Sequence, residues 1–206
     1  MTTRDLRQVR PPDAILRAAA GRPRAFVPAE ALRLALHLFW GKGYAATSLS
    51  DLTAAMGLGR SSFYACFGSK RALLLAAVEL YADALFAQLS AIAKDALDPV
   101  VALHMIINHI ADIDGGRRGC FFVNCITELA LHDPALAAYG QRHIARMAAL
   151  MTALFVRAGL TAPLADTRAT ALLATAIGTT TLRKAGIAPA QLHALLDQAQ
   201  RCLLAG

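Results

Sequence analysis

Residues 47–71 read TSLSDLTAAMGLGRSSFYACFGSKR and predict two short helices joined by a tight turn. Ser48, followed three residues later by Asp51, is a capping signal that satisfies free N–H groups at the start of the first helix. The Gly-Leu-Gly segment at 57–59 ends this helix and redirects the chain, since glycine tolerates a positive φ. The second helix spans about residues 60–67 and opens with small and cationic donors. This pattern is typical of a helix-turn-helix, whose second helix presents its N-terminal residues to base edges.

The rest of the chain predicts an all-α fold with a large hydrophobic core. Apolar residues make up 56% of the 206 positions and charged residues 17%, a balance that argues against extended disorder. Leucine and alanine dominate, and runs of β-branched residues are few, which favours helix over strand. Apolar spacing and Pro or Gly boundaries predict helices over residues 28–42, 70 to the low 90s, 99–113, 117–131, 134–158, 163–184 and 189–204.

Positive charge is concentrated at the N-terminal end of the chain. The net charge is +7, and residues 1–71 contain 11 Lys and Arg against 4 Asp and Glu, whereas residues 72–206 contain 10 of each. This distribution is expected of a segment that neutralises DNA phosphates. We therefore expect a basic arm over residues 1–24, a DNA-binding unit over residues 25–71 and a further helical unit over residues 72–206. The arm either contacts DNA or is a solvated tail, and the sequence leaves both interpretations open.

Other classes of protein have little support in the sequence. The longest uncharged run, Ala169–Leu182, has 14 residues, whereas a membrane-spanning helix needs roughly 20. The arginine-rich N-terminus lacks the apolar region of a secretory signal, so we expect no membrane partner and a cytoplasmic location. Nucleophile-elbow, P-loop and HExxH patterns are absent, and His104 and His109 do not share a helix face well. We therefore expect no enzymatic activity, no metal and no cofactor.

Four segments of the chain resemble the DNA-binding region of the TetR (tetracycline-repressor) family of transcriptional regulators. They are FWGKGY at residues 39–44, TSLSDL at 47–52, AAMGL at 54–58 and SFYACFGSK at 62–70. The resemblance covers about residues 28–75, and residues 118–124 (RGCFFVN) are similar to a segment of one subgroup of the family. It implies a homodimer of nine-helix subunits whose last two helices form a four-helix dimer interface. It also implies that residues 72–206 form a ligand-binding and dimerisation domain.

The resemblance carries specific roles onto seven residues around the two short helices. The start of the first helix contacts phosphate, the start of the second faces bases, and two further positions contact the DNA backbone. The residues that would contact phosphate are Thr47 and Ser48. Those that would face bases are Arg60, Ser61 and Ser62, and those that would contact the DNA backbone are Tyr64 and Lys70. For Tyr64, packing against the helix over residues 28–42 is the alternative. Gly59, Ala65 and Cys66 depart from the residues usual in the family, so the preferred base sequence is not predicted.

The predicted partners are double-stranded DNA, a second copy of the chain and a small-molecule effector. A dimer presents two recognition helices about one helical turn apart, roughly 34–36 Å, so we expect a palindromic operator. The helix over residues 163–184 is rich in Ala, Thr and Gly and permits close approach of a partner helix, with burial inside one subunit as the alternative. An effector that prefers another spacing of the two DNA-binding units would release a repressor from this operator.

Polar residues among apolar walls in the second half of the chain are candidates for effector contacts. Asn124 and Glu128 share a helix face, and methionines supply adaptable walls. The candidates are His104, Asn108, Asn124, Glu128, Met147, Met151, Phe155 and Thr175. Each of them is alternatively an ordinary core or surface residue. The sequence shows no basic cluster that would suit a strongly anionic ligand, so we expect a mostly apolar effector.

A thiol-based redox-sensing regulator is the alternative function. Cys120 and Cys125 flank one helical turn. Cys120 also follows Arg117 and Arg118 near a helix start, and these charges would lower the pKa of its thiol and make it reactive. The simpler interpretation is that both cysteines are buried small residues.

Overall fold

The computed structural model describes residues 28–204 as nine helices joined by turns and loops, with no strand among these residues. The helices are α2 (Pro28–Lys42), α3 (Leu49–Met56), α4 (Arg60–Phe67), α5 (Lys70–Asp95), α6 (Pro99–Ala111), α7 (Phe121–Leu129), α8 (Pro134–Arg157), α9 (Ala162–Ala185) and α10 (Pro189–Leu204). The predicted all-α fold is confirmed. The predicted basic arm over residues 1–24 lies outside the described residues.

Local signals define both helices of the motif. At α3, the Ser48 hydroxyl accepts a hydrogen bond from the Asp51 amide (3.0 Å), and the Asp51 carboxylate accepts one from the Ser48 amide (2.9 Å). This reciprocal capping box satisfies two free N–H groups. The hydrogen bond from the Ser48 amide, together with Lys42, lowers the pKa of Asp51 to about 2, so the cap stays ionised. Gly57 ends α3 in the left-handed region with a φ of 63°.

The helix α2 braces this pair of helices. Its apolar residues repeat at helical spacing and are buried: Ala31, Leu32, Ala35, Leu36, Phe39 and Trp40. Leu52 of α3 and Phe63 of α4 are also inaccessible to solvent. The three helices therefore form a small unit with a shared core. Because α2 also packs against α5, this unit is joined to the rest of the protein through apolar contacts.

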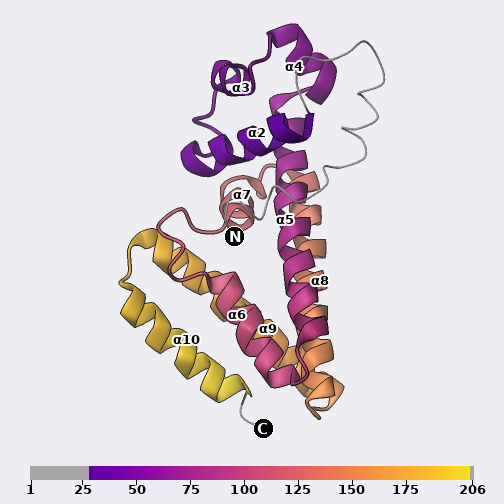
Figure 1. Cartoon of the computed structure of the whole chain (residues 1–206), viewed down its shortest axis with the longest axis vertical. Helices are drawn as coiled ribbons and strands as arrows, with labels where there is room; N and C mark the ends of the chain where they lie inside the picture. The colour runs from indigo at the N-terminus through magenta and orange to yellow at the C-terminus, as the bar shows by residue number, and fades with distance from the viewer. Residues whose placement is uncertain (1–27, 205–206) are drawn as a thin grey trace.

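The helices α5 to α10 form a larger helical body. Figure 1 shows α5 and α8 as two long helices running alongside each other, with α6, α9 and α10 forming the other part of the body. α9 packs against α8, α6 and α10, while the short α7 lies between the α2–α4 unit and the body (Figure 1). Within residues 28–204, α5 alone has the length and hydropathy of a membrane span, but most of its leucines and alanines are buried in the protein core.

One helix is clearly shorter than predicted. The helix expected over residues 117–131 spans only Phe121–Leu129. Gly116 and Gly119 adopt positive φ angles of 74° and 69°, which hold the preceding residues in a turn that only glycine forms easily. As a result, the Arg117-Arg118 pair lies on a loop that faces the end of α2.

Candidate functional site

The exposed residues at the start of α4 form the first candidate site. Arg60, Ser61 and Ser62 are all solvent-exposed, whereas Phe63 and Phe67 are buried with ring centroids 5.7 Å apart. The first turn of α4 therefore offers a guanidinium group, two hydroxyl groups and free backbone N–H groups to a ligand with acceptor atoms. Figure 1 shows α3 and α4 at the end of the molecule opposite the C-terminus, so this surface projects away from the helical body.

The two residues that precede α3 lie in different environments. Ser48 is exposed, and its hydroxyl oxygen accepts a hydrogen bond from the Asp51 amide. Its hydroxyl hydrogen therefore remains available to a phosphate oxygen. Thr47 is completely buried, and its hydroxyl donates to the Gly43 carbonyl at 2.6 Å. The Thr47 side chain thus holds the turn between α2 and α3. Its burial does not fit the phosphate contact that we expected of it.

Tyr64 and Lys70 complete the predicted DNA-binding set. The Tyr64 side chain is 53% exposed and meets Phe63 edge-on, with 5.5 Å between ring centroids. Its exposure leaves it accessible to a ligand approaching α4. Lys70 begins α5, and its ammonium group lies 4.2 Å from the centre of the Tyr44 ring. This cation–π contact joins the start of α5 to the turn between α2 and α3.

The end of α2 and the turn after it are hydrogen-bonded to α7 and the loop before it. The Glu128 carboxylate of α7 accepts hydrogen bonds from the N–H groups of Tyr44 (3.2 Å) and Ala45 (3.0 Å). The Trp40 indole donates to the Arg118 carbonyl at 3.3 Å. Tyr44 and Ala45 lead directly into α3, so α7 is in direct contact with the turn that positions this helix.

A salt bridge connects the start of α5 to the start of α8. The Arg71 guanidinium donates two hydrogen bonds of 2.6 Å to Asp133, which caps the start of α8. These bonds, and one from the Leu136 amide, lower the pKa of Asp133. The Arg71 side chain is 52% exposed, so this pair contributes little to the free energy of folding. We assign it the role of orienting the start of α5 relative to α8.

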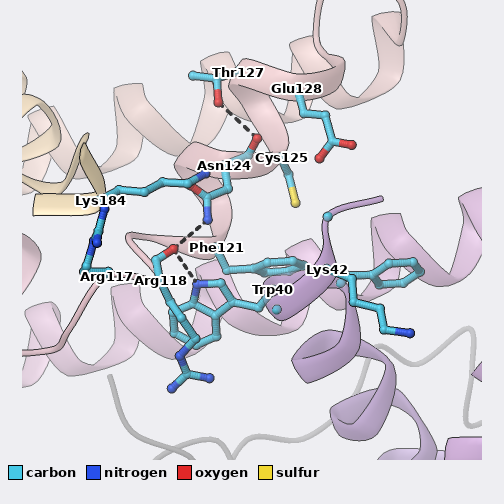
Figure 2. A pocket seen from close by; sticks show the side chains of 13 residues that line it. Trp40, Lys42, Arg117, Arg118, Phe121, Asn124, Cys125, Thr127, Glu128 and Lys184 are labelled. Carbon is cyan, nitrogen blue, oxygen red and sulfur yellow. Dashed lines mark hydrogen bonds between the residues drawn. The ribbon is translucent and has the colours of Figure 1, made fainter. Parts of the chain in front are cut away.

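A cleft of about 500 Å³ opens between the end of α2 and α7, and we call it the junction cleft (Figure 2). Residues 39–43 form one side of it, and residues of α7 form another. The Asn124 side chain donates to the Arg118 carbonyl at 2.8 Å and accepts from the Lys184 ammonium group at 2.9 Å. Two of the predicted effector residues, Asn124 and Glu128, line this cleft.

A second, apolar cavity lies inside the helical body, and we call it the body cavity. Five helices contribute to its walls, through Leu85, Ile110, Phe122, Met147 and Ile177 among others. Met147 is the predicted effector residue that lies here. The cavity volume is about 20 Å³, which is room for about one water molecule. A larger ligand would therefore enter only if these helices moved apart.

His143 of α8 borders the body cavity and is buried, with 2% of its surface exposed. Its ring lies edge-on to Phe122 at 4.6 Å. An Arg146 nitrogen lies 2.9 Å from Nδ1. Nδ1 therefore accepts, and the ring proton is on Nε2, which has no partner among the described residues. Burial, reinforced by Arg146, lowers the pKa of His143 to about 4.

The remaining predicted effector residues line neither cavity. His104 and Asn108 of α6 both contact the buried Gln200 of α10: His104 Nδ1 donates to Gln200 Oε1, and Gln200 Nε2 donates to Asn108 Oδ1 at 3.2 Å. These two residues thus attach α10 to α6. Met151 and Phe155 are buried in the core, and the Thr175 hydroxyl donates to a carbonyl of its own helix, that of Ala171.

The region that holds the motif matches a known family. Residues 31–77 match the model of the bacterial regulatory proteins, tetR family. An uncharacterised helix-turn-helix-type transcriptional regulator of Bacillus subtilis, YezE, is 34% identical over 128 residues. The helix-turn-helix-type transcriptional repressor ComR of Escherichia coli is 33% identical over 119 residues. This region of the chain belongs to the TetR family. TetR-family proteins are DNA-binding transcription factors and not enzymes, which agrees with the predicted function class.

The similarity to individual TetR-family proteins differs in extent. The aligned region is 59% of this chain and 64% of YezE, and 56% of this chain and 57% of ComR, so it spans less than two thirds of these curated relatives. The TetR-family regulator CifR, solved with 26-bp double-strand operator DNA, matches 87% of this chain and 98% of its own, at 27% identity and a TM-score of 0.73. A TetR-family regulator from Streptomyces coelicolor shares the fold over 85% of this chain and 93% of its own, at 20% identity and a TM-score of 0.77.

Cys120 and Cys125 do not have the properties of redox-sensing cysteines. The Tyr81 hydroxyl donates to the Cys120 sulfur at 3.6 Å, and burial raises the pKa of the Cys120 thiol. Burial also raises the pKa of Cys125 to about 12. A raised pKa disfavours the thiolate that reacts with oxidants. The expectation that Arg117 and Arg118 lower the pKa of Cys120 is wrong: desolvation of the thiol has the largest effect, and the positive charge that opposes it is that of Arg183.

Two features of the site were not predicted from the sequence. His143 precedes Met147 by one turn of α8, and this spacing would have placed it among the candidates. The expectation that no basic cluster is present is also wrong. Four basic residues from three distant segments line the junction cleft: Lys42, Arg117, Arg118 and Lys184. The adjacent pair Arg117-Arg118 was the only part of this cluster visible as a local pattern.

Proposed function

We propose that this TetR-family protein is a homodimeric repressor that binds a palindromic operator and is released by a small effector. The main support for DNA binding comes from the start of α4. Residues 60–62 are exposed there, while Phe63 and Phe67 of the same helix are buried in the core. In a helix-turn-helix this end of the second helix enters the major groove. The excess of positive charge in residues 1–71 supports the same function. A DNA-binding role would place the protein in the cytoplasm.

The outer faces of α9 and α10 support dimerisation. α9 exposes Ala174 and Gly178, one turn apart, and a Cβ added at Gly178 would meet no atom within 4 Å. Leu182 and Leu195 are 39% and 43% exposed. Small residues beside exposed leucines suit the close approach of a second subunit. A monomeric mass at micromolar concentration, measured by sedimentation, would contradict the dimer.

The body cavity supports release by a mostly apolar effector. Its walls are apolar, and His143 Nε2 offers a polar group that has no partner in residues 28–204. Because the cavity volume is only about 20 Å³, a ligand must displace the helices around it, including α5 and α7, which contact the α2–α4 unit. An effector that binds the opened state more tightly shifts the population away from the DNA-binding state.

Selection of bound fragments from genomic DNA, followed by gel-shift titration, tests the DNA-binding function. Arg60→Ala is expected to weaken binding to the selected DNA by about 5- to 150-fold, since a base-contacting arginine contributes about 1–3 kcal/mol. Lys70→Ala should also weaken binding, more uniformly across sequences. Arg142→Ala removes one exposed charge from α8, away from the motif, and serves as the control. Unchanged affinity of both motif variants would contradict the assignment of this surface.

A further inference from the structure

The junction cleft gathers positive charge that the proposed recognition surface does not use. Lys42 comes from the end of α2, Arg117 and Arg118 from the loop before α7, and Lys184 from the last turn of α9. Among the described residues that line the cleft, Glu128 is the one carboxylate. The cleft therefore has a strong excess of positive charge.

Most of this charge has no acidic partner in the described chain. Lys42 pairs with Asp51 at 3.0 Å. No carboxylate among residues 28–204 forms an ion pair with Arg117, Arg118 or Lys184. Like charges that share one cleft repel each other, and a bound anion would remove this repulsion. The charge distribution thus favours an anionic ligand over a neutral one.

The fold holds two of these cations close together. The Arg117 guanidinium lies so close to Gly186 that a Cβ added there would come within 3.1 Å of it. The Lys184 side chain likewise lies beside Gly119, with a corresponding distance of 3.4 Å, and donates to Asn124 at 2.9 Å. Figure 2 shows Arg117 and Lys184 together at one end of the cleft. Gly186 thus leaves room for the Arg117 side chain and Gly119 for the Lys184 side chain, and the two side chains lie at the same end of the cleft.

The cleft also has the size and mixed chemistry of a small-molecule site. Its volume of about 500 Å³ lies within the range of roughly 300–1,000 Å³ that is typical of ligand pockets. Trp40 and Phe121 give it an aromatic wall, while Asn124 and Thr127 add polar atoms. A ligand with an anionic group for the basic end and an organic body for the aromatic wall matches this lining.

We propose that the junction cleft binds a small organic anion bearing phosphate or carboxylate groups, and that this binding lowers the affinity for DNA. The regulatory half rests on the proposed DNA-binding function. Glu128 supplies the connection, because its carboxylate accepts the N–H groups of Tyr44 and Ala45 just before α3. A bound anion repels this carboxylate and neutralises positive charge beside the motif, and both effects weaken DNA binding.

Thermal melting of the full chain without DNA tests the site itself. Inorganic pyrophosphate and citrate serve as the phosphate and carboxylate probes, with ionic strength held constant by NaCl because salt screens exposed charges. A probe at a hundredfold excess over its dissociation constant should raise the melting temperature by about 5 °C or more. The probe with the larger effect identifies the preferred anionic group.

Paired double variants decide whether the cleft is the binding site. Arg117→Gln/Lys184→Gln should lose the stabilisation by the probe. The control variant Lys94→Gln/Arg142→Gln removes the same amount of charge from exposed positions outside the cleft. It should retain the stabilisation by the probe. All four side chains are exposed, so both proteins should melt near the wild-type temperature without the probe. Equal stabilisation of the two double variants, or none of the wild type by either probe, overturns the proposed site.

Gel-shift titration with the selected DNA tests the regulatory half. The stabilising probe should raise the dissociation constant for DNA by about tenfold in the wild type and in the control variant, within the usual range of allosteric coupling. It should have no such effect on the cleft variant. A probe that stabilises the wild type but leaves its DNA affinity unchanged overturns regulation through this cleft. If the wild type does not bind DNA even without a probe, the proposed DNA-binding function is contradicted instead. Failure of the proposed function is therefore distinguishable from failure of regulation through the cleft.

Discussion

The α2–α4 unit and the helical body satisfy their polar groups in different ways. In the α2–α4 unit, hydrogen bonds such as the capping box of α3 join residues three positions apart, and the proposed recognition residues stay exposed. In the body, polar side chains meet over long distances in sequence: Asn108 and Gln200 are 92 positions apart, and Asn124 and Lys184 are 60 positions apart. Local contacts determine the first region, and long-range contacts determine the second.

This difference suits the two regions to different roles. A unit held by local contacts keeps its internal geometry when the body repacks, so it moves as one piece. A body whose helices meet through scattered polar contacts around a small apolar cavity is suited to repacking when a ligand enters. The hydrogen bonds from Tyr44 and Ala45 to Glu128 then carry the change from one region to the other.

Truncation of one phenylalanine in each region is expected to have the largest effect. Phe63 and Phe155 are 0% and 2% exposed, so each change to alanine should cost about 3–5 kcal/mol of the free energy of unfolding. Phe63→Ala should accelerate amide hydrogen exchange in α3 and α4 above all and abolish DNA binding. Phe155→Ala should accelerate exchange in the body instead. Uniform loss of protection in both variants would show that the two regions unfold as one unit.

Acidification should destabilise the body through His143. Its folded pKa of about 4 lies below the ordinary 6.5, so the unfolded chain binds the proton first as pH falls. Stability is therefore complete above pH 6.5 and decreases toward pH 4, by on the order of 3 kcal/mol over this window. In urea unfolding, His143→Gln should have a shallower pH dependence than the wild type. The remaining slope includes His37 of α2, whose pKa is also lowered by burial. An unchanged slope in His143→Gln would contradict this assignment.

The same contrast explains which parts of the structure were predictable. The capping box at Ser48 and the buried face of α2 follow from spacings of three and four residues, so the sequence predicted both. The boundaries of α7 were missed because Gly119 acts through its φ angle rather than through a periodic pattern. The junction cleft depends on contacts such as that between Trp40 and Arg118, 78 positions apart, which no local pattern reveals. The body cavity, likewise, is formed only when five helices meet.

Glu128→Gln tests the connection between the two regions and should have a smaller effect. The amide oxygen still accepts one hydrogen bond, but the charge that strengthens the bonds from Tyr44 and Ala45 is lost, at a cost of about 1 kcal/mol. Amide exchange at these two residues should accelerate while the core of α5 is unaffected. Glu30→Gln, which removes an exposed carboxylate in the first turn of α2, provides the matched control. Equal exchange rates in both variants would contradict the proposed connection.

The smallest expected effect is a gain in stability confined to the α2–α4 unit. Gly59 precedes α4 with a φ of −72° and no side-chain cap, and a Cβ added there meets no atom within 4 Å. Gly59→Ser should therefore stabilise the protein by a few tenths of a kcal/mol, because a serine oxygen accepts a free N–H group of α4. Gly57→Ser is the control: space is equally open there, but the φ of 63° penalises any side chain. Opposite signs in urea unfolding without DNA would show that local backbone geometry determines this unit, and a loss at Gly59 would contradict that conclusion.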